Sequence, residues 1–242
     1  MNLLVNPRIH IAPVGFEIER VVTPTIENRA DLVYLLVHNN VSADKSKPYA
    51  DEIRKQLKKN KIQYKDVYAD RNNLLEIVKT VKEIIIEHRN SEIFINVSSG
   101  SKIQAIGCMM GCMIFDDRKN LRPYYVEPVT YVDKPQTTGV KKTHPLVAYQ
   151  MQTPKPELLE ICTIIKERGR IKKSELADIA IQKKIISVNS TQNLKMARFT
   201  SLDKNIITPL KNIWNFIEEE KVGRNRYVFL TEDGKLASQF LF

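Results

Sequence analysis

Cysteine is scarce in this sequence of 242 residues. It occurs only at Cys108, Cys112 and Cys162, an odd number without any C-x-x-C pair. That spacing fits neither a disulfide framework nor a zinc ribbon. We therefore expect no metal site and no bound cofactor, and we interpret the three cysteines as small apolar side chains of the core.

Long apolar segments are also lacking. The longest, residues 103–115, contains Gln104 and is shorter than the roughly 20 residues that a membrane-spanning helix requires. The first residues lack the basic stretch and the small-residue cleavage site of a secretory signal. The sequence predicts a cytoplasmic protein without membrane contact.

Acidic residues are too few to balance the basic ones. There are 28 against 38, a net charge of +10, and the last 92 residues contain 16 basic and 11 acidic side chains. The excess of +5 in this part is spread over fewer residues than the +5 of residues 1–150. A polyanionic partner is therefore favoured for the C-terminal part.

The first half of the chain alternates β-type runs with amphipathic helical runs. The helical runs span residues 49–59, 72–88 and 101–115. Two of the β-type runs are almost continuously apolar, as strands are when helices cover both faces of a parallel sheet. We predict an α/β domain with a Rossmann-like parallel sheet over residues 1–133. Its strands are expected at 8–14, 31–38, 64–69, 92–97 and 121–129.

Two glycines stand one helical turn apart in the helical run 101–115. Gly107 and Gly111 lie among cysteines and methionines. We interpret them as packing residues that let the helix backbone approach the sheet closely, in preference to a cofactor or thiol site.

Proline marks a boundary in the middle of the chain. Six of the eleven prolines fall between Pro123 and Pro156, beside Gly139 and the polar run 136–138. Such a stretch is typical of a connection between domains. We take residues 134–153 as a linker.

In the C-terminal part, apolar residues recur with helical spacing in three segments. The first spans residues 157–168, and the second is expected to begin with Ser174 as its cap. A polar stretch, residues 182–201, separates them from a third pattern, whose apolar stripe begins at Ile206 and ends at Ile217. Pro209 within that pattern predicts a kink or a late start of the helix.

A basic hairpin follows the third helical pattern. Residues 222–231 read as a tight turn leading into a strand, and a short helix is expected from Asp233. Three helices and a basic hairpin predict a winged helix-turn-helix, DNA-binding domain over residues 154–242. Exposed amide and cationic side chains would contact base edges and phosphates of double-stranded DNA, and the alternative is a solvated polar face. The candidates are Lys204, Asn205, Thr208, Lys211, Asn212, Arg224, Asn225 and Arg226.

The sharpest signal in the first domain is the segment 96–102, Asn-Val-Ser-Ser-Gly-Ser-Lys, where the fourth strand ends and a helix begins. Backbone N–H groups at a helix start favour an anion, and ligands of open α/β sheets collect at the carboxyl ends of strands. This predicts phosphate or nucleotide binding. The alternative is that Ser101 only caps the helix and that Lys102 is a solvated charge. Neither a Walker A loop nor a G-x-G-x-x-G motif is present.

The turn after the first strand, residues 12–17, is expected at the same edge of the sheet. Gly15 would permit close approach of a ligand, or it would serve only a tight turn. Glu17 and Arg20 could be solvated helix charges.

Three residues of the loop carry a family resemblance. Asn96, Ser98 and Lys102 match the [DN]-x-[ST]-x-x-x-[RK] pattern of CARF (CRISPR-associated Rossmann fold) domains. Residues 210–234 are similar to the winged helix of archaeal CARF-type transcription regulators. The resemblance implies a role in CRISPR-associated antiviral defence and a homodimer that binds a cyclic oligoadenylate, such as cyclic tetra-adenylate, across its two-fold axis. From the two loops and this resemblance, the candidate ligand-binding residues are Gly15, Phe16, Asn96, Ser98, Ser99, Gly100, Ser101 and Lys102.

These features predict a ligand-responsive, DNA-binding transcription regulator and not an enzyme. Two alternatives stay open. Some CARF domains cleave their own cyclic ligand, and Ser98, Ser99 and Lys102 could orient and stabilise such a cleavage. A winged helix also serves as a protein-interaction module, and such an adaptor would show no salt-dependent DNA affinity.

Overall fold

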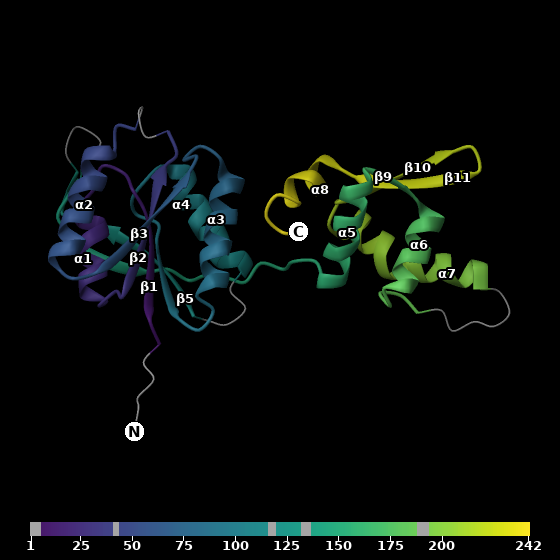
Figure 1. Cartoon of the computed structure of the whole chain (residues 1–242), viewed down its shortest axis with the longest axis horizontal. Coiled ribbons are helices and arrows are strands. Elements are labelled where there is room, and N and C mark those ends of the chain that lie inside the picture. The colour runs from purple at the N-terminus through teal and green to yellow at the C-terminus, as the bar shows by residue number, and fades with distance from the viewer. Residues whose placement is uncertain (1–5, 41–43, 116–119, 132–136, 188–193) are drawn as a thin grey trace, which may run out of the picture. The chain divides into compact units, whose positions relative to one another are not determined.

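The computed structural model describes residues 6–40, 44–115, 120–131, 137–187 and 194–242. The chain forms two compact units, Met1–Gln152 and Thr153–Phe242 (Figure 1). Each unit has an apolar core of its own. No helix in these described ranges is both long and apolar enough to span a bilayer.

A six-stranded sheet forms the centre of the first unit. Its strands in chain order are β1 (Arg8–Pro13), β2 (Leu32–His38), β3 (Gln63–Ala69), β4 (Glu92–Asn96), β5 (Leu121–Glu127) and β8 (Lys142–Pro145). Their order across the sheet is β3-β2-β1-β4-β5-β8. All neighbouring pairs are parallel except β5–β8, which is antiparallel. The predicted α/β class with a parallel-dominated sheet is confirmed.

Two pairs of helices cover opposite faces of this sheet. The helices are α1 (Glu19–Glu27), α2 (Lys47–Lys59), α3 (Leu74–Glu87) and α4 (Lys102–Phe115). Val33 and Leu35 of β2 pack in a cluster with α1 and α2. Tyr34 and Leu36 of the same strand pack with α3 and α4. Strand β2 reads as a continuous apolar run because both of its faces are buried.

The cysteines are all buried, as predicted. Burial raises the pKa of the Cys108 and Cys162 thiols to about 12. A thiol with so high a pKa is a poor nucleophile and metal ligand. These side chains contribute to packing.

The two glycines of α4 allow close packing, but against another helix and not against the sheet as expected. A Cβ on Gly107 would lie 2.7 Å from Ile77 Cγ2, and one on Gly111 would lie 2.5 Å from Val81 Cγ1. Both partners belong to α3. The missing side chains therefore set the distance between α3 and α4.

Much of the stretch that the sequence assigned to a linker lies in the first unit. A two-stranded sheet joins β6 (Thr130–Tyr131) and β7 (Thr137–Thr138), and β8 extends the main sheet. After β8, the Leu146 N–H donates to Pro123 O at 2.9 Å and the Met151 N–H to Met113 O at 2.7 Å. Residues 134–136 of the expected linker lie outside the described residues.

The second unit has the element order of a winged helix (Figure 1). Its helices are α5 (Pro156–Arg168), α6 (Lys173–Gln182), α7 (Leu194–Leu202) and α8 (Glu232–Ala237), and its strands are β9 (Arg170–Lys172), β10 (Ile217–Val222) and β11 (Asn225–Leu230). The strands form an antiparallel sheet in the order β10-β11-β9. The hairpin of β10 and β11 is called the wing below.

The third helical region differs from its prediction. It begins at Leu194 within the presumed polar stretch, not at Ile206, and continues through the π-helical segments η1 (Asp203–Ile207) and η2 (Pro209–Ile213). The Thr208 N–H donates to Asp203 O, five residues back. Because Pro209 has no N–H to donate, the wider π spacing lets the helical region continue across it.

Two smaller expectations in this unit were also wrong. Ser174 does not cap α6, because the residue at the cap position is Lys172 and no side chain caps this helix. Ile217, which was placed on the third helical stripe, is the first residue of β10 and is fully buried.

Candidate ligand site and nucleic-acid interface

The loop between β4 and α4 is held by its own side chains. Asn96 is fully buried, its Nδ2 donates to Arg20 O at 2.8 Å, and its Oδ1 accepts from the Ser98 N–H at 2.8 Å. An amide with both ends bonded in this way fixes the loop against the start of α1. The sequence placed Asn96 among the ligand contacts, whereas its side chain is engaged within the protein.

The serine hydroxyls of this loop are also engaged. Ser98 Oγ accepts from the Val126 N–H at 2.6 Å, which ties the loop to the end of β5. Ser99 Oγ donates to Glu17 Oε2 at 3.1 Å, which ties it to the turn after β1. Ser101 Oγ donates to Arg71 O at 2.9 Å and accepts from the Gln104 N–H at 3.1 Å. The last bond is a helix-capping contact of the kind considered as the alternative for Ser101.

Gly15 and Gly100 bring the two loops together. A Cβ on Gly15 would lie 2.6 Å from Gly100 N. Gly100 itself has φ of +80°, and a Cβ there would lie 2.6 Å from Pro13 Cβ. Close contact between the β1 turn and the β4 loop accounts for both glycines without a ligand.

Lys102 and Phe16 are the predicted residues whose side chains stay available. Lys102 is exposed at the start of α4, and among the described residues its ammonium has no hydrogen-bond or ion-pair partner. Phe16 is partly exposed, and its ring meets Tyr49 edge to face at a centroid distance of 5.3 Å. Among the predicted ligand residues, all of which the structure describes, the geometry leaves one cation without a described partner and one partly exposed aromatic ring.

Glu17 and Arg20 are not solvated charges, contrary to one interpretation of the sequence. Their side chains are only 14% and 6% exposed, and Arg20 Nη1 lies 3.7 Å from Glu17 Oε1. Arg20 Nε donates to Val126 O at 3.0 Å. Burial raises the pKa of Glu17, while the nearby charge of Arg20 and the bond from Ser99 oppose the rise. The sequence shows only their spacing of three residues, which does not reveal partners on β5.

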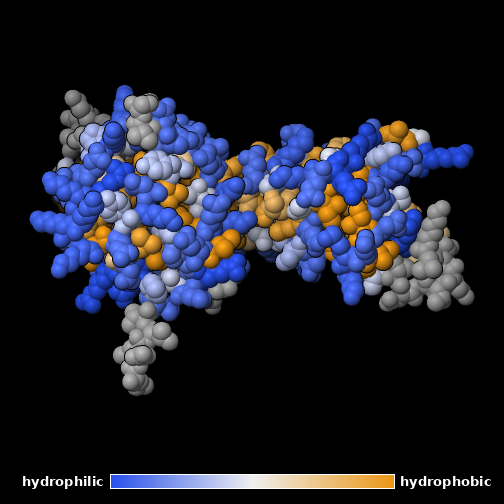
Figure 2. Space-filling view, in the orientation of Figure 1, coloured by the Kyte–Doolittle hydropathy of each residue, from blue (hydrophilic) through white to orange (hydrophobic). Residues whose placement is uncertain are grey.

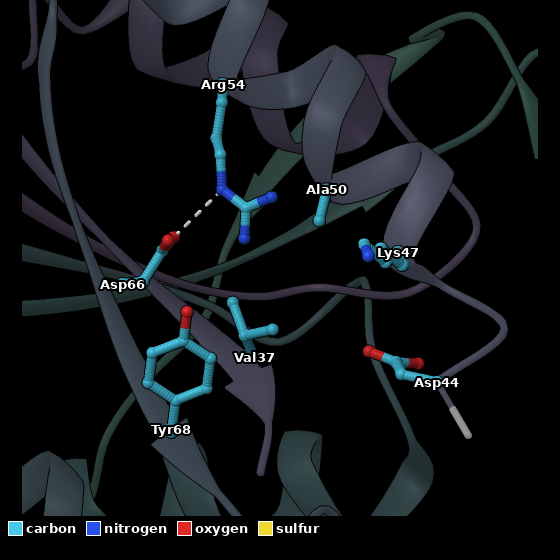
Figure 3. A pocket seen from close by; sticks show the side chains of 7 residues that line it. All are labelled: Val37, Asp44, Lys47, Ala50, Arg54, Asp66 and Tyr68. Atoms are coloured by element: carbon cyan, nitrogen blue, oxygen red, sulfur yellow. Dashed lines mark hydrogen bonds and ion pairs between the residues drawn. The ribbon is translucent and has the colours of Figure 1, made fainter. Parts of the chain in front are cut away.

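A pocket with a volume of about 320 Å³ lies between α2 and strands β2 and β3 (Figure 3). Arg54 points into it from α2 and donates to Asp66 Oδ1 of β3 at 3.2 Å. On the far side, Asp44 would have a raised pKa from burial, but bonds from Ser46 and Arg71 lower it overall. The sequence did not single out any of these residues. The residues that line this pocket are Val37, Asp44, Lys47, Ala50, Arg54, Asp66 and Tyr68.

All eight candidate DNA contacts are exposed. Five come from η1, η2 and the residue between them, and three from the turn and the start of β11. The protruding tip of this hairpin is hydrophilic (Figure 2, upper right). Lys211 Nζ lies 3.9 Å from Glu219 Oε2, and Asn205 Nδ2 donates to Ser201 Oγ at 3.2 Å. Within the described part of the chain, Arg224 and Arg226 have no ion-pair partner. The eight residues are Lys204, Asn205, Thr208, Lys211, Asn212, Arg224, Asn225 and Arg226.

A groove with a volume of about 660 Å³ separates α7 from the wing. Arg198 and Phe199 line it from α7, and the sequence missed them because the third helical region was expected to start later. Arg198 Nη1 lies 2.5 Å from Asp178 Oδ1, and its guanidinium stacks 4.9 Å from the Phe199 ring centroid. The described residues that line the groove are Lys173, Ser174, Arg198, Phe199, Asp203, Arg224, Asn225 and Arg226.

Comparison with solved structures gives low-identity likenesses. Csm6 of Enterococcus italicus, bound to cyclic hexa-2′-fluoro-hexa-dAMP, is 12% identical with a TM-score of 0.43, over 86% of this chain and 56% of that one. Can2 of Sulfobacillus thermosulfidooxidans, in complex with cyclic tetra-adenylate, is 16% identical with a TM-score of 0.42, over 96% of this chain and 63% of that one. No correspondence between single residues follows at this level.

Similarity in sequence is more specific. Protein MJ1513 of Methanocaldococcus jannaschii, which is uncharacterised, is 30% identical over 192 residues, 66% of this chain and 56% of the relative. The chain thus spans little more than half the length of this curated relative. A family model described as HFX_2341_N-like, N-terminal, matches residues 8–131, and the DUF6293 C-terminal winged helix domain matches residues 157–241. The chain belongs to the HFX_2341_N-like family and carries the DUF6293 winged helix behind that domain, which confirms the predicted order of an α/β domain and a winged helix.

Proposed function

We propose that this protein is a ligand-responsive transcription regulator that binds double-stranded DNA and is not an enzyme. The observation that carries the proposal is a combination of two features of the described residues: Lys102 has no partner at the carboxyl edge of a parallel sheet, and the arginines on the wing of the winged helix have no ion-pair partner. The first lies where open α/β sheets bind anionic ligands, and the second lies where winged helices contact DNA.

The ligand we propose is a cyclic oligoadenylate or a related nucleotide. Lys102 would bind a phosphodiester, and the exposed part of the Phe16 ring would contact a base. Gly15, Asn96, Ser98, Ser99, Gly100 and Ser101 would line the site by shaping its two loops, because their side chains or close contacts serve the loops themselves. The match of Asn96, Ser98 and Lys102 to the CARF pattern supports this class of ligand.

The hydrogen bonds of the loop favour binding over cleavage. A ring nuclease must orient a ribose 2′-hydroxyl against its neighbouring phosphate with groups free to do so. The hydroxyls of Ser99 and Ser101 donate to acceptors within the protein, and Ser98 Oγ accepts from the Val126 N–H. For this reason we place the CARF-type ring nuclease second.

A gel-shift titration tests the proposed function directly. We expect the full chain to bind duplex DNA from the promoter of its own gene, and cyclic tetra-adenylate to change the apparent affinity, because a ligand that binds two states differently shifts their populations. Analysis of the same mixtures for linear products reports any ring cleavage. Absence of DNA binding at low salt would favour the protein-interaction adaptor, and cleavage of the ring would favour the enzyme.

The proposed regulator acts as a two-fold homodimer. Two winged helices related by symmetry bind two half-sites, which raises affinity without new kinds of contact. We expect the mass of a dimer from light scattering at micromolar concentration, with a symmetric footprint on DNA. A monomer mass both with and without DNA would contradict this part of the proposal.

A further inference from the structure

A single buried lysine joins the two DNA-facing elements of the second unit. Lys173, the first residue of α6, places its Nζ 2.7 Å from Glu219 Oε1 of β10 and in direct contact with Asp203 Oδ1 of η1. The Lys173 side chain is 9% exposed and that of Glu219 is 12% exposed. One ammonium therefore connects the third helical region to the wing.

Burial of this lysine is not explained by stability alone. Removing an ammonium and a carboxylate from water costs several kcal/mol, and such a pair is often no more stabilising than apolar side chains of the same size. The best-attested benefit of a buried ionic group is that it specifies one geometry. Lys173, Asp203 and Glu219 come from three separate elements, so the geometry they specify is the relative placement of those elements.

The base of the wing is held by the core residues Ile217 and Val228 and by the ion pair of Arg170 with Glu220, whereas its tip is paired only within the hairpin. Strand β10 is an edge strand that pairs only with β11, and β9 pairs with β11 only over Tyr227–Phe229. Beyond that point the wing is a two-stranded ribbon with the pairs Lys221↔Arg226 and Val222↔Asn225. A two-stranded ribbon is marginally stable by itself. The ion pairs of Lys173 with Asp203 and Glu219, called the tie below, lie near the base of the wing, so a change there alters the position of the tip.

The tie also lies at the groove between α7 and the wing. Lys173 and Asp203 line that groove together with Arg224 and Arg226. The charge of Lys173 is already balanced by two carboxylates, whereas the wing arginines have no ion-pair partner in the described residues. Lys173 is thus suited to position the wing and the arginines to bind phosphate.

We propose that Lys173 is a positioning residue for DNA binding: it fixes the wing against the third helical region so that both contact the same duplex. This inference rests on the proposed DNA-binding function. Lys173 acts through Glu219 and Asp203 and does not itself contact DNA.

A double-mutant cycle in the full chain tests the inference. Lys173→Met should lower affinity for a labelled duplex of mixed sequence by about tenfold, within the range of coupling between residues of one network. In the Arg224→Ala/Arg226→Ala background the same change should lower it by less than about twofold, because no wing contact remains to be misplaced. Equal losses in both backgrounds would overturn the inference. Failure of the unmutated chain to bind any duplex would instead overturn the proposed function.

Two controls separate positioning from folding and from charge. Lys183→Met removes the same charge from an exposed pair with Glu160 and should leave affinity unchanged within about twofold. Lys173→Met/Glu219→Leu removes the tie without leaving Glu219 unpaired, and it should melt no lower than the unmutated chain yet keep the affinity loss. Full affinity in this double variant would overturn the inference.

A distance measurement tests the inference without DNA. The natural cysteines are buried, so spin labels at Met196→Cys on α7 and Val222→Cys on the wing can be attached selectively. We expect Lys173→Met to broaden the distribution of distances between the two labels. An equally narrow distribution with and without Lys173 would show that other contacts hold the wing.

Discussion

Lys102→Ala is expected to weaken binding of cyclic tetra-adenylate by about ten- to a hundredfold while leaving the melting temperature of the ligand-free protein unchanged. The variant loses one charge-assisted bond to phosphate, worth about 1.5–3 kcal/mol. The exposed ammonium has no partner among the described residues, so its removal breaks no contact of the fold. Calorimetric titration with cyclic tetra- and hexa-adenylate, together with thermal melts, makes the measurement.

The control for Lys102 is another exposed lysine of the first unit. Lys79→Ala on α3 removes the same charge away from the loops and should leave binding unchanged. If the Lys102 variant binds as tightly as the unmutated chain, Lys102 does not contact the ligand. If the unmutated chain binds neither ring, the sensor function itself is wrong.

The sheet of the first unit could be predicted because its strands are short apolar runs bounded by turns. Each of the five expected strands is found within two residues of its predicted ends. Helix α1 was given no bounds, although Glu17 and Arg20 were considered as helix charges, because Pro24 inside it interrupts the periodic pattern on which bounds depend. Strand β8 was missed because its short polar sequence pairs only at the sheet edge, where one neighbour suffices.

The start of the third helical region could not be predicted from an α-helical period. The apolar residues from Ile206 onward recur every three or four residues, as in an α-helix, but they lie in η1 and η2, whose π-type bonds change the number of residues per turn. When a period of 3.6 residues is extended backwards through Asp203, it therefore no longer matches the positions of the residues in α7. As a result, Arg198 and Phe199, which line the groove, were missing from the candidate interface.

For the loop between β4 and α4, the sequence indicated candidate residues but not the hydrogen bonds that their side chains make within the protein. A motif at the end of β4 could be recognised from residues 96–102 alone. The partners that engage its hydroxyls are Arg71, Val126 and Glu17, which lie far away in the chain. No local pattern reveals them, so the sequence could not separate the engaged hydroxyls from the ammonium of Lys102, which has no partner among the described residues.

The wing arginines should carry a large part of the affinity for DNA. Arg224→Ala/Arg226→Ala removes two exposed cations without ion-pair partners in the described residues, so no charge is left uncompensated in the protein. If each contacts one phosphate, the slope of log affinity against log salt should fall by about two units, with at least about a tenfold loss of affinity at low salt. Fluorescence anisotropy over a salt series measures both quantities. An unchanged slope would remove the wing from the interface.

A charge-matched variant decides whether this loss reflects contacts or net charge. Lys155→Ala/Lys183→Ala also removes two exposed basic side chains from the second unit, outside the proposed interface. It should shift affinity slightly at low salt and leave the slope near its original value, because released counterions come from phosphates in contact.

Since phosphate contacts carry no sequence information, the loss in the wing variant should also be equal for all duplexes. A loss that depends on sequence would instead place Arg224 or Arg226 at base edges in a groove, where a single good contact discriminates by about 1–3 kcal/mol.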